Sequence, residues 1–157
     1  MAENLIIEGT TKREKYACLL PQIKSVVSKE IDMIANMANI ASMLHFTFNF
    51  FWTGFYRVKD EELVLTTFQG PLACTRIKKG RGVCGSAFER KQTIIVEDVD
   101  KFEGHIACSS LSKSEIVVPV INNNEVIAVL DIDSKELATF DLIDKEFLEQ
   151  IIEILVK

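Results

Sequence analysis

The sequence predicts an α+β fold in which a mostly antiparallel central sheet carries the N- and C-terminal helices on one face. Its length of 157 residues leaves room for one domain, because domains usually span roughly 100–200 residues. Apolar residues follow a helical spacing before residue 50 and after residue 141, and strand-type runs lie between them. This order, in which helices are followed by strands and then by another helix, is typical of a single α+β domain. The domain is expected to cover residues 1–157.

Two N-terminal helices are expected over about residues 11–46. Thr11 and Glu14 have the spacing of a capping box, in which the hydroxyl and the carboxylate each satisfy a free backbone N–H. Pro21 predicts a kink or a short break, because proline lacks the N–H that a helix interior needs. Ser28 is expected to cap the second helix. A stripe on that helix is expected to pack in the core or at a dimer interface: Ile31, Ile34, Ala38, Ala41 and His45.

The sheet and its loops are expected over about residues 50–134. Residues 55–58 and 63–67 are β-rich runs separated by a short polar link, which predicts a hairpin. Residues 115–121 and 126–133 predict a second hairpin. Its turn consists of asparagines, which tolerate a positive φ.

The segment between the two hairpins is rich in glycine. Gly80, Gly82 and Gly85 come before a short helix expected near residues 86–90, and a strand is expected over 93–96. A C-terminal helix is expected over about residues 141–156. Its apolar side is formed by Leu142, Ile143, Phe147, Ile151 and Leu155.

Charge and hydropathy exclude several classes of partner. The net charge is −5 and there is no long basic run, which argues against nucleic acid and anionic membranes, since both are held mainly by Lys and Arg. No apolar stretch approaches the ~18 residues of a membrane span, and the N-terminus lacks the pattern of a secretion signal. We therefore expect a cytoplasmic protein.

The four cysteines are too few for a disulfide scaffold at this length and are expected to be reduced, buried or chemically active. Cys18 is interpreted as a core residue of the first helix. Cys74, Cys84 and Cys108 are expected in loops or at element ends beside glycines. A single cysteine is usually a small buried hydrophobic residue, but three in such loops favour redox chemistry. No metal is expected, because His105-x-x-Cys108 is the sole metal-like spacing and such a pair is weak evidence for zinc.

Six ordered motifs make the sequence resemble the free methionine-R-sulfoxide reductase family, a stand-alone branch of the GAF fold. The motifs are WTGFY (52–56), FQGPLACTRI (68–77), GVCG (82–85), GHIAC (104–108), SEIVVP (114–119) and LDIDS (130–134). The likeness extends to IANMAN (34–39) in the second predicted helix, so that it covers most of the chain. The resemblance implies a single GAF-like domain and a thiol-dependent oxidoreductase that acts on free methionine-R-sulfoxide. The preference for the R epimer rests on this resemblance alone.

The resemblance also implies roles for the cysteines. Cys108 would attack the sulfoxide sulfur as a thiolate, release methionine and become a sulfenic acid. Cys74 would resolve the sulfenic acid to a disulfide, and Cys84 would substitute for it or act as a relay. Thioredoxin, an external dithiol, would then reduce the disulfide by exchange. No bound cofactor is implied.

Three acids match family positions: Glu115, Asp131 and Asp133. Asp131 and Asp133 lie two apart on a predicted strand, so that both point to the same face. Acids gathered in one pocket repel one another, so one is expected to keep its proton and serve as the general acid. The others would bind the substrate ammonium group. Trp52 would pack on the substrate methyl group, and Tyr56 would complete the wall.

The sequence departs from the family pattern beside the expected nucleophile. Glu103 precedes Gly104 where the family has proline, and Ser109 follows Cys108 where the family has an acid. An acid next to the nucleophile affects its protonation, so this change bears on rate and thiol pKa more than on reaction class. Two other functions stay open at this point: a non-enzymatic GAF sensor of a small ligand, and a redox-switch protein that reports oxidation without turnover. A homodimer is also compatible with the sequence.

Overall fold

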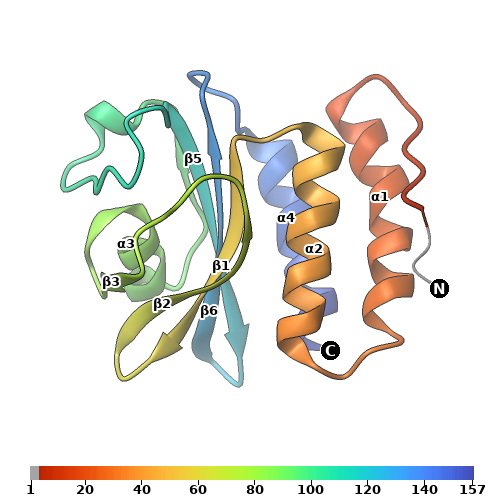
Figure 1. Ribbon diagram of the computed structural model, residues 1–157, viewed down its shortest axis with the longest axis horizontal. Helices are drawn as coiled ribbons and strands as arrows, with labels where there is room; N and C mark the ends of the chain where they lie inside the picture. Colours follow the sequence, from red (N-terminus) through yellow and green to blue (C-terminus); the bar gives the residue numbers. More distant parts are fainter. Residues whose placement is uncertain (1–3) are drawn as a thin grey trace.

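A six-stranded sheet with helices on both faces makes up the computed structural model, which describes residues 4–157 (Figure 1). The helices are α1 (Lys12–Val27), α2 (Met33–Phe48), α3 (Gly82–Arg90) and α4 (Leu142–Val156). The strands are β1 (Trp52–Lys59), β2 (Glu62–Gln69), β3 (Arg76–Lys78), β4 (Ile94–Val96), β5 (Ser114–Asn122) and β6 (Glu125–Ser134). A 3-10 turn, η1 (Val99–Lys101), precedes the long loop that leads into β5. No helix in the described range is long and apolar enough to cross a membrane.

The strand order is β3-β2-β1-β6-β5-β4, and every neighbouring pair is antiparallel. Helices α2 and α4 lie against one face of the sheet, and α1 packs outside them, on the right of Figure 1. Helix α3 lies on the opposite face beside β3. The predicted α+β class, with the N- and C-terminal helices on one face, is therefore confirmed.

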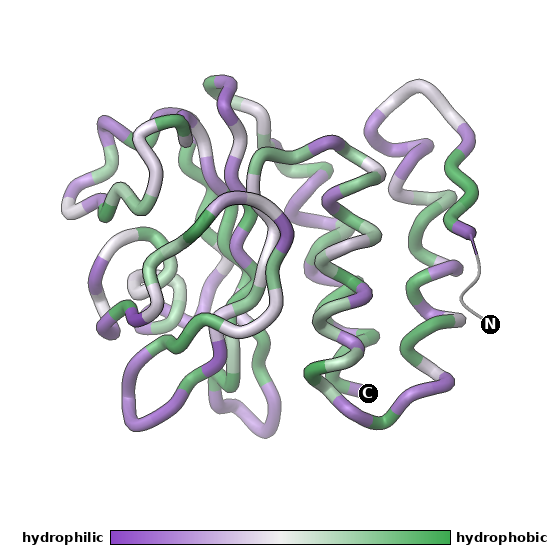
Figure 2. Tube along the Cα trace, viewed as in Figure 1, coloured by the Kyte–Doolittle hydropathy of each residue, from purple (hydrophilic) through white to green (hydrophobic). Residues whose placement is uncertain are grey.

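Both hairpin turns use residues with a positive φ. Asp60 and Glu61 have φ values of 52° and 60° between β1 and β2, and Asn123 and Asn124 have values of 50° and 63° between β5 and β6. Two consecutive positive φ angles match the right-handed twist of the flanking strands. Both turns are hydrophilic and lie at the bottom of Figure 2. The two predicted hairpins are confirmed.

The alternation of side chains along the central strands divides the interior into two clusters. Ile116 on β5, with Leu130 and Ile132 on β6, packs into the core under α1, α2 and α4. The residues between them, including Val117 and Val129, pack on the α3 side with Trp52. Since successive side chains of a strand point to opposite faces, Asp131 and Asp133 must face the α3 side.

Helix α1 runs through Pro21 without the predicted break. Pro21 and Ala17, four residues earlier, are both exposed, so the carbonyl that loses its helical hydrogen bond lies on the solvent side. The opposite face of the helix packs in the core through Tyr16, Leu19, Ile23 and Val27. Burial of this face maintains the helix across the proline.

The start of α2 also differs from the prediction. Ser28 is the C-cap of α1, and Asp32 caps α2 by accepting a 2.9 Å hydrogen bond from the Ala35 N–H. Ile31 is fully exposed and Ile34 is 40% exposed. The buried face consists of Asn36, Met37, Ile40, Ala41 and Leu44. As a core stripe the prediction is wrong at Ile31 and Ile34, because it was counted from Ile31, which precedes the helix. Ala41 is buried, and Ala38 and His45 are half-buried.

Other element boundaries moved by a few residues. Strand β1 begins at Trp52 rather than at 55, and α3 begins at Gly82 rather than at 86. The edge strand β3 was missed, because three residues after a turn carry almost no periodic signal. Helix α4 begins after Asp141 as expected, although Leu142 from its predicted apolar side is exposed.

A buried polar contact joins α1 to α4. The Asp144 side chain is 1% exposed; it accepts a 2.8 Å hydrogen bond from the Tyr16 hydroxyl and forms an ion pair with Lys12. Burial and the neighbouring Asp144 raise the pKa of Tyr16, so its hydroxyl remains a donor. Asp144 on α4 therefore satisfies two polar groups of α1 at once.

We expect Asp144→Ala to lower the free energy of unfolding by about 3 kcal/mol, because the buried Tyr16 hydroxyl loses its acceptor and Lys12 loses one of its two carboxylate partners. Urea unfolding followed by circular dichroism measures this change. The matched control is Glu146→Ala, which breaks an ion pair with Arg13 in which both side chains are half exposed. The control should unfold close to the wild-type midpoint. Equal midpoints for the two variants would contradict the role given to Asp144.

Candidate active site

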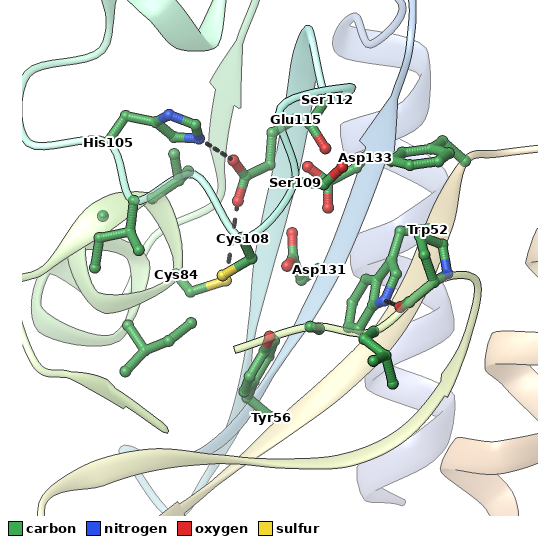
Figure 3. Close-up of a pocket in the computed structure, with 18 of the residues that line it drawn as sticks. Trp52, Tyr56, Cys84, His105, Cys108, Ser109, Ser112, Glu115, Asp131 and Asp133 are labelled. Atoms are coloured by element: carbon green, nitrogen blue, oxygen red, sulfur yellow. Dashed lines mark hydrogen bonds and ion pairs between the residues drawn. The ribbon is translucent and has the colours of Figure 1, made fainter. Parts of the chain in front are cut away.

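A pocket lies on the α3 side of the sheet, between β1, β5, β6, α3 and two loops (Figure 3). The first loop follows β2 and the second leads from η1 to β5. Most of the predicted site residues line this pocket: Trp52, Tyr56, Cys84, Cys108, Glu115, Asp131 and Asp133. The fold thus gathers side chains that are up to 81 residues apart, from Trp52 to Asp133 (133 − 52 = 81).

Cys74 is not among the residues that line the pocket, but it is joined to the pocket by a disulfide with Cys108. The two residues are 34 apart in sequence, and their Cα atoms are 5.5 Å apart. Cys108 is exposed and Cys74 is half-buried. The disulfide therefore links the two loops at the mouth of the pocket, where a dissolved thiol can reach it.

The other two cysteines are free. Cys84 is buried in the first turn of α3, which agrees with the predicted position at an element end. Its Sγ lies 3.9 Å from Glu115 Oε1 (Figure 3). Cys18 is half-buried and not in the core, because its Sγ faces the N-terminal segment, 3.4 Å from the carbonyl oxygen of Ile6.

The register of the strands brings the three carboxyl groups together. Glu115 on β5 lies opposite Asp133 on β6, and Trp52 on β1 also lies opposite Asp133. Asp131 is on the same face of β6, two residues earlier. Glu115 and Asp131 are each 6% exposed. Figure 3 shows Asp131 and Asp133 between Cys108 and Trp52, and the Glu115 carboxyl group beside them, turned toward His105 and Cys84.

The electrostatics of this cluster are unusual. Burial raises the pKa of Asp131 to about 6 and raises the pKa values of Glu115 and Asp133 well above those of free carboxyl groups. The neighbouring charge of Asp131 raises the pKa values of the other two further. Burial together with the carboxylates also raises the pKa of the Cys84 thiol. At neutral pH, Glu115, Asp133 and the Cys84 thiol therefore hold protons that they can donate, and Asp131 is the group that ionises most readily.

Several pocket residues were not predicted as site residues. His105, on the same loop as Cys108, has its Nε2 3.7 Å from Glu115 Oε2, and burial lowers its pKa. The buried Ser112 lines the pocket beside Asp133. Arg81 lines it at the N-cap of α3. The sequence indicated His105 only through its spacing to Cys108, which is weak evidence for a metal site. The structure gives no support to that pair, because Cys108 forms the disulfide with Cys74.

The indole of Trp52 is held in place from several sides. Its Nε1 donates a 3.1 Å hydrogen bond to the carbonyl of Pro71, and its ring stacks on Phe68 and Tyr56. A side chain at Gly54 would meet this ring at 2.6 Å, so glycine is needed there. The indole is therefore a fixed apolar wall of the pocket.

This arrangement can perform thiol chemistry beside a proton source. An exchangeable disulfide lies at the mouth, and buried carboxyl groups and an aromatic wall lie inside. Cys84, Glu115 and Asp131 are, within residues 4–157, the residues whose potential ligand atoms are close enough to hold a cation, all within 4.8 Å of one another.

Both the sequence and the structure of this chain are similar to GAF domains and to free methionine-R-sulfoxide reductases. The model of the GAF domain family matches residues 31–155. The chain is 56% identical to GAF domain-containing protein A of Dictyostelium discoideum, with 99% of both chains covered. It is 43% identical to the free methionine-R-sulfoxide reductase of Escherichia coli (strain K12), with 90% of this chain and 86% of the relative covered. The X-ray structure of free methionine-R-sulfoxide reductase from Neisseria meningitidis in complex with its substrate has a TM-score of 0.95 and 51% identity, and the match covers 97% of this chain and 92% of that one.

Proposed function

This chain belongs to the free methionine-R-sulfoxide reductase family of GAF domains, and we propose that it reduces free methionine-R-sulfoxide to methionine. One observation carries the proposal: a disulfide-forming pair, Cys74 and Cys108, lies at the mouth of a pocket that is lined by three carboxyl groups, two of them buried and one half-buried. Reduction of a sulfoxide requires both a thiol that accepts the oxygen and a proton source for that oxygen.

The reaction begins with the reduced protein. The Cys108 thiolate attacks the sulfoxide sulfur while a carboxylic acid of the cluster protonates the sulfoxide oxygen. The oxygen leaves methionine and ends on Cys108 as a sulfenic acid, so that the cysteine is oxidised and the substrate is reduced to the sulfide. The Cys74 thiol then attacks the sulfenic acid, and water leaves as the disulfide forms. Exchange with two thiols of an external reductant restores the starting state.

The acids in this proposal have two roles. Burial favours the protonated forms of Glu115 and Asp133, which supports one of them as the general acid. Asp131, whose pKa of about 6 leaves it the most acidic of the three, suits the substrate ammonium group. The fixed indole of Trp52 with Tyr56 offers an apolar surface to the methyl group.

The reductant, the oligomeric state and the location belong to the same proposal. Thioredoxin is the proposed reductant, because an exposed Cys108 in a loop disulfide suits exchange with a protein dithiol. A homodimer is supported by Phe46, 70% exposed, and Ile34, 40% exposed, on α2. A cytoplasmic location agrees with a cysteine pair that must be reduced in each cycle.

Turnover of separated epimers tests the activity. Purified protein with dithiothreitol should convert the R epimer of free methionine sulfoxide to methionine and leave the S epimer unchanged. If the disulfide forms without any consumption of either epimer, the protein is a redox switch instead. A GAF sensor would bind the ligand and release it unchanged.

Substrate selectivity gives a quantitative prediction. We expect N-acetylation of methionine-R-sulfoxide to lower kcat/KM at least about tenfold, the factor that ~1.4 kcal/mol produces. The neutral amide cannot pair with the buried carboxylate, and charge-assisted hydrogen bonds are stronger than neutral ones. Steady-state kinetics on both substrates measures the ratio.

Variants of the three acids separate their roles. Asp131→Asn should mainly raise KM for free methionine-R-sulfoxide. The ratio of kcat/KM between the free and the N-acetylated substrate should therefore fall. Glu115→Gln or Asp133→Asn should lower kcat at whichever position is the general acid. Equal efficiency on the two substrates with wild-type protein would exclude this account of the acidic cluster.

A further inference from the structure

The interior of the pocket carries a cluster of acidic groups. Glu115 and Asp131 are buried and Asp133 is half-buried beside them, yet no lysine or arginine among residues 4–157 forms an ion pair with any of the three. The sole ion-pair partner within this range is His105, 3.7 Å from Glu115, and burial lowers its pKa away from the charged form. Buried charges are normally paired or bound to a metal ion.

One atom of the cluster has no partner of any kind. Asp131 Oδ1 is buried and accepts no hydrogen bond, on a residue that is 6% exposed. Leaving a buried acceptor unsatisfied is costly. The Asp131 carboxyl group lies beside the Cys84 thiol and the Glu115 carboxyl group (Figure 3). One potential ligand atom from each of the three residues lies within 4.8 Å of the other two. A cation bound between these three side chains would satisfy the unpaired oxygen of Asp131.

We propose that Cys84, Glu115 and Asp131 bind a Zn²⁺-type divalent cation when no substrate is present. A thiolate with two carboxylates is a ligand set that Zn²⁺ accepts and that the harder Mg²⁺ and Ca²⁺ do not favour. Small side-chain rotations bring ligand atoms within 4.8 Å of one another into the ~2.0–2.3 Å bonds of a zinc site. The inference goes beyond the reductase activity and does not depend on it.

The three ligands sit on regular elements rather than on mobile loops. Cys84 belongs to α3, Glu115 to β5 and Asp131 to β6. The fourth coordination position faces the pocket, where water completes the tetrahedron as it does in zinc sites that exchange ligands. Because we assign the substrate ammonium group to Asp131, the cation and the substrate exclude each other.

Cobalt binding to the oxidised protein tests the site. With the Cys74–Cys108 disulfide intact, the remaining thiols are Cys18 and Cys84, so the nucleophile cannot contribute a ligand. Titration with Co²⁺ should produce a thiolate-to-metal charge-transfer band that saturates at about one ion per chain, and Zn²⁺ should abolish it by displacement. Because no reductant is present, the result is independent of turnover.

Three variants identify the ligands. Cys84→Ser should lose the band, and its matched control Cys18→Ser should keep it. Asp131→Asn should keep a band but bind Co²⁺ at least about tenfold more weakly, since even the loss of a supporting group around a metal costs 10–100-fold in affinity. Circular dichroism shows that each variant is folded. A wild-type protein without the band, or a band that survives Cys84→Ser, would overturn the proposal.

Discussion

Cys108→Ser is expected to abolish methionine formation, even in a single turnover with dithiothreitol present. The serine hydroxyl is not ionised near neutral pH and is a far weaker nucleophile than a thiolate, so the first bond to the sulfoxide sulfur does not form. The Cys84 thiol is buried and its pKa is raised by burial and by the surrounding carboxylates, which keeps it protonated.

The measurement is the amount of methionine released after mixing reduced protein with an equimolar amount of the R-sulfoxide. Cys18→Ser is the matched control, because Cys18 is a free cysteine of α1 outside the pocket, and it should release as much methionine as the wild type. Both proteins should unfold at similar urea concentrations. Methionine release by Cys108→Ser would show that Cys108 is not the nucleophile and that another cysteine attacks the sulfoxide.

Cys74→Ser is expected to keep the first turnover and lose most thioredoxin-driven cycling. Resolution follows the chemical step, so each active site should still release about one methionine in the absence of reductant. Without the Cys74 thiol, the sulfenic acid on Cys108 does not form the exposed disulfide that thioredoxin attacks. We expect Cys84 to be a poor substitute, because a protonated thiol attacks slowly.

Rapid quench of the first turnover and a coupled thioredoxin assay measure the two steps separately. The Cys74→Ser and Cys84→Ser double variant shows how much cycling depends on Cys84, and it should cycle little more slowly than Cys74→Ser alone. Loss of the first turnover in Cys74→Ser would mean that Cys74 acts before resolution and that the order of steps is different.

The parts of the fold that the sequence predicted correctly depend on local interactions. The capping box of Thr11 and Glu14, the helix after Asp141 and the asparagine turn after β5 all formed as expected. In each case the groups that satisfy one another lie within a few residues, so their pattern can be recognised without knowledge of the rest of the chain.

The errors arose where tertiary packing decided between local alternatives. Pro21 did not break α1, because burial of the opposite face outweighs one lost hydrogen bond. Ser28 and Asp32 are both good caps, and the position of α2 against the sheet selected Asp32. Sequence reasoning could not see which face of α2 meets β1, so it selected Ile31 and Ile34, which are exposed.

The sequence by itself determined the α+β class, the two central hairpins and the residue types of a thiol reductase. Only the tertiary structure decided that these residues meet. The register of β5 against β6 sets Glu115 opposite Asp133, the folding of two loops joins Cys74 to Cys108, and α3 directs Cys84 toward Glu115. These contacts span 18 to 34 residues of sequence (133 − 115 = 18 for the first). Burial then changes the pKa of each group, because desolvation depends on everything packed around a side chain and not on its neighbours in the chain.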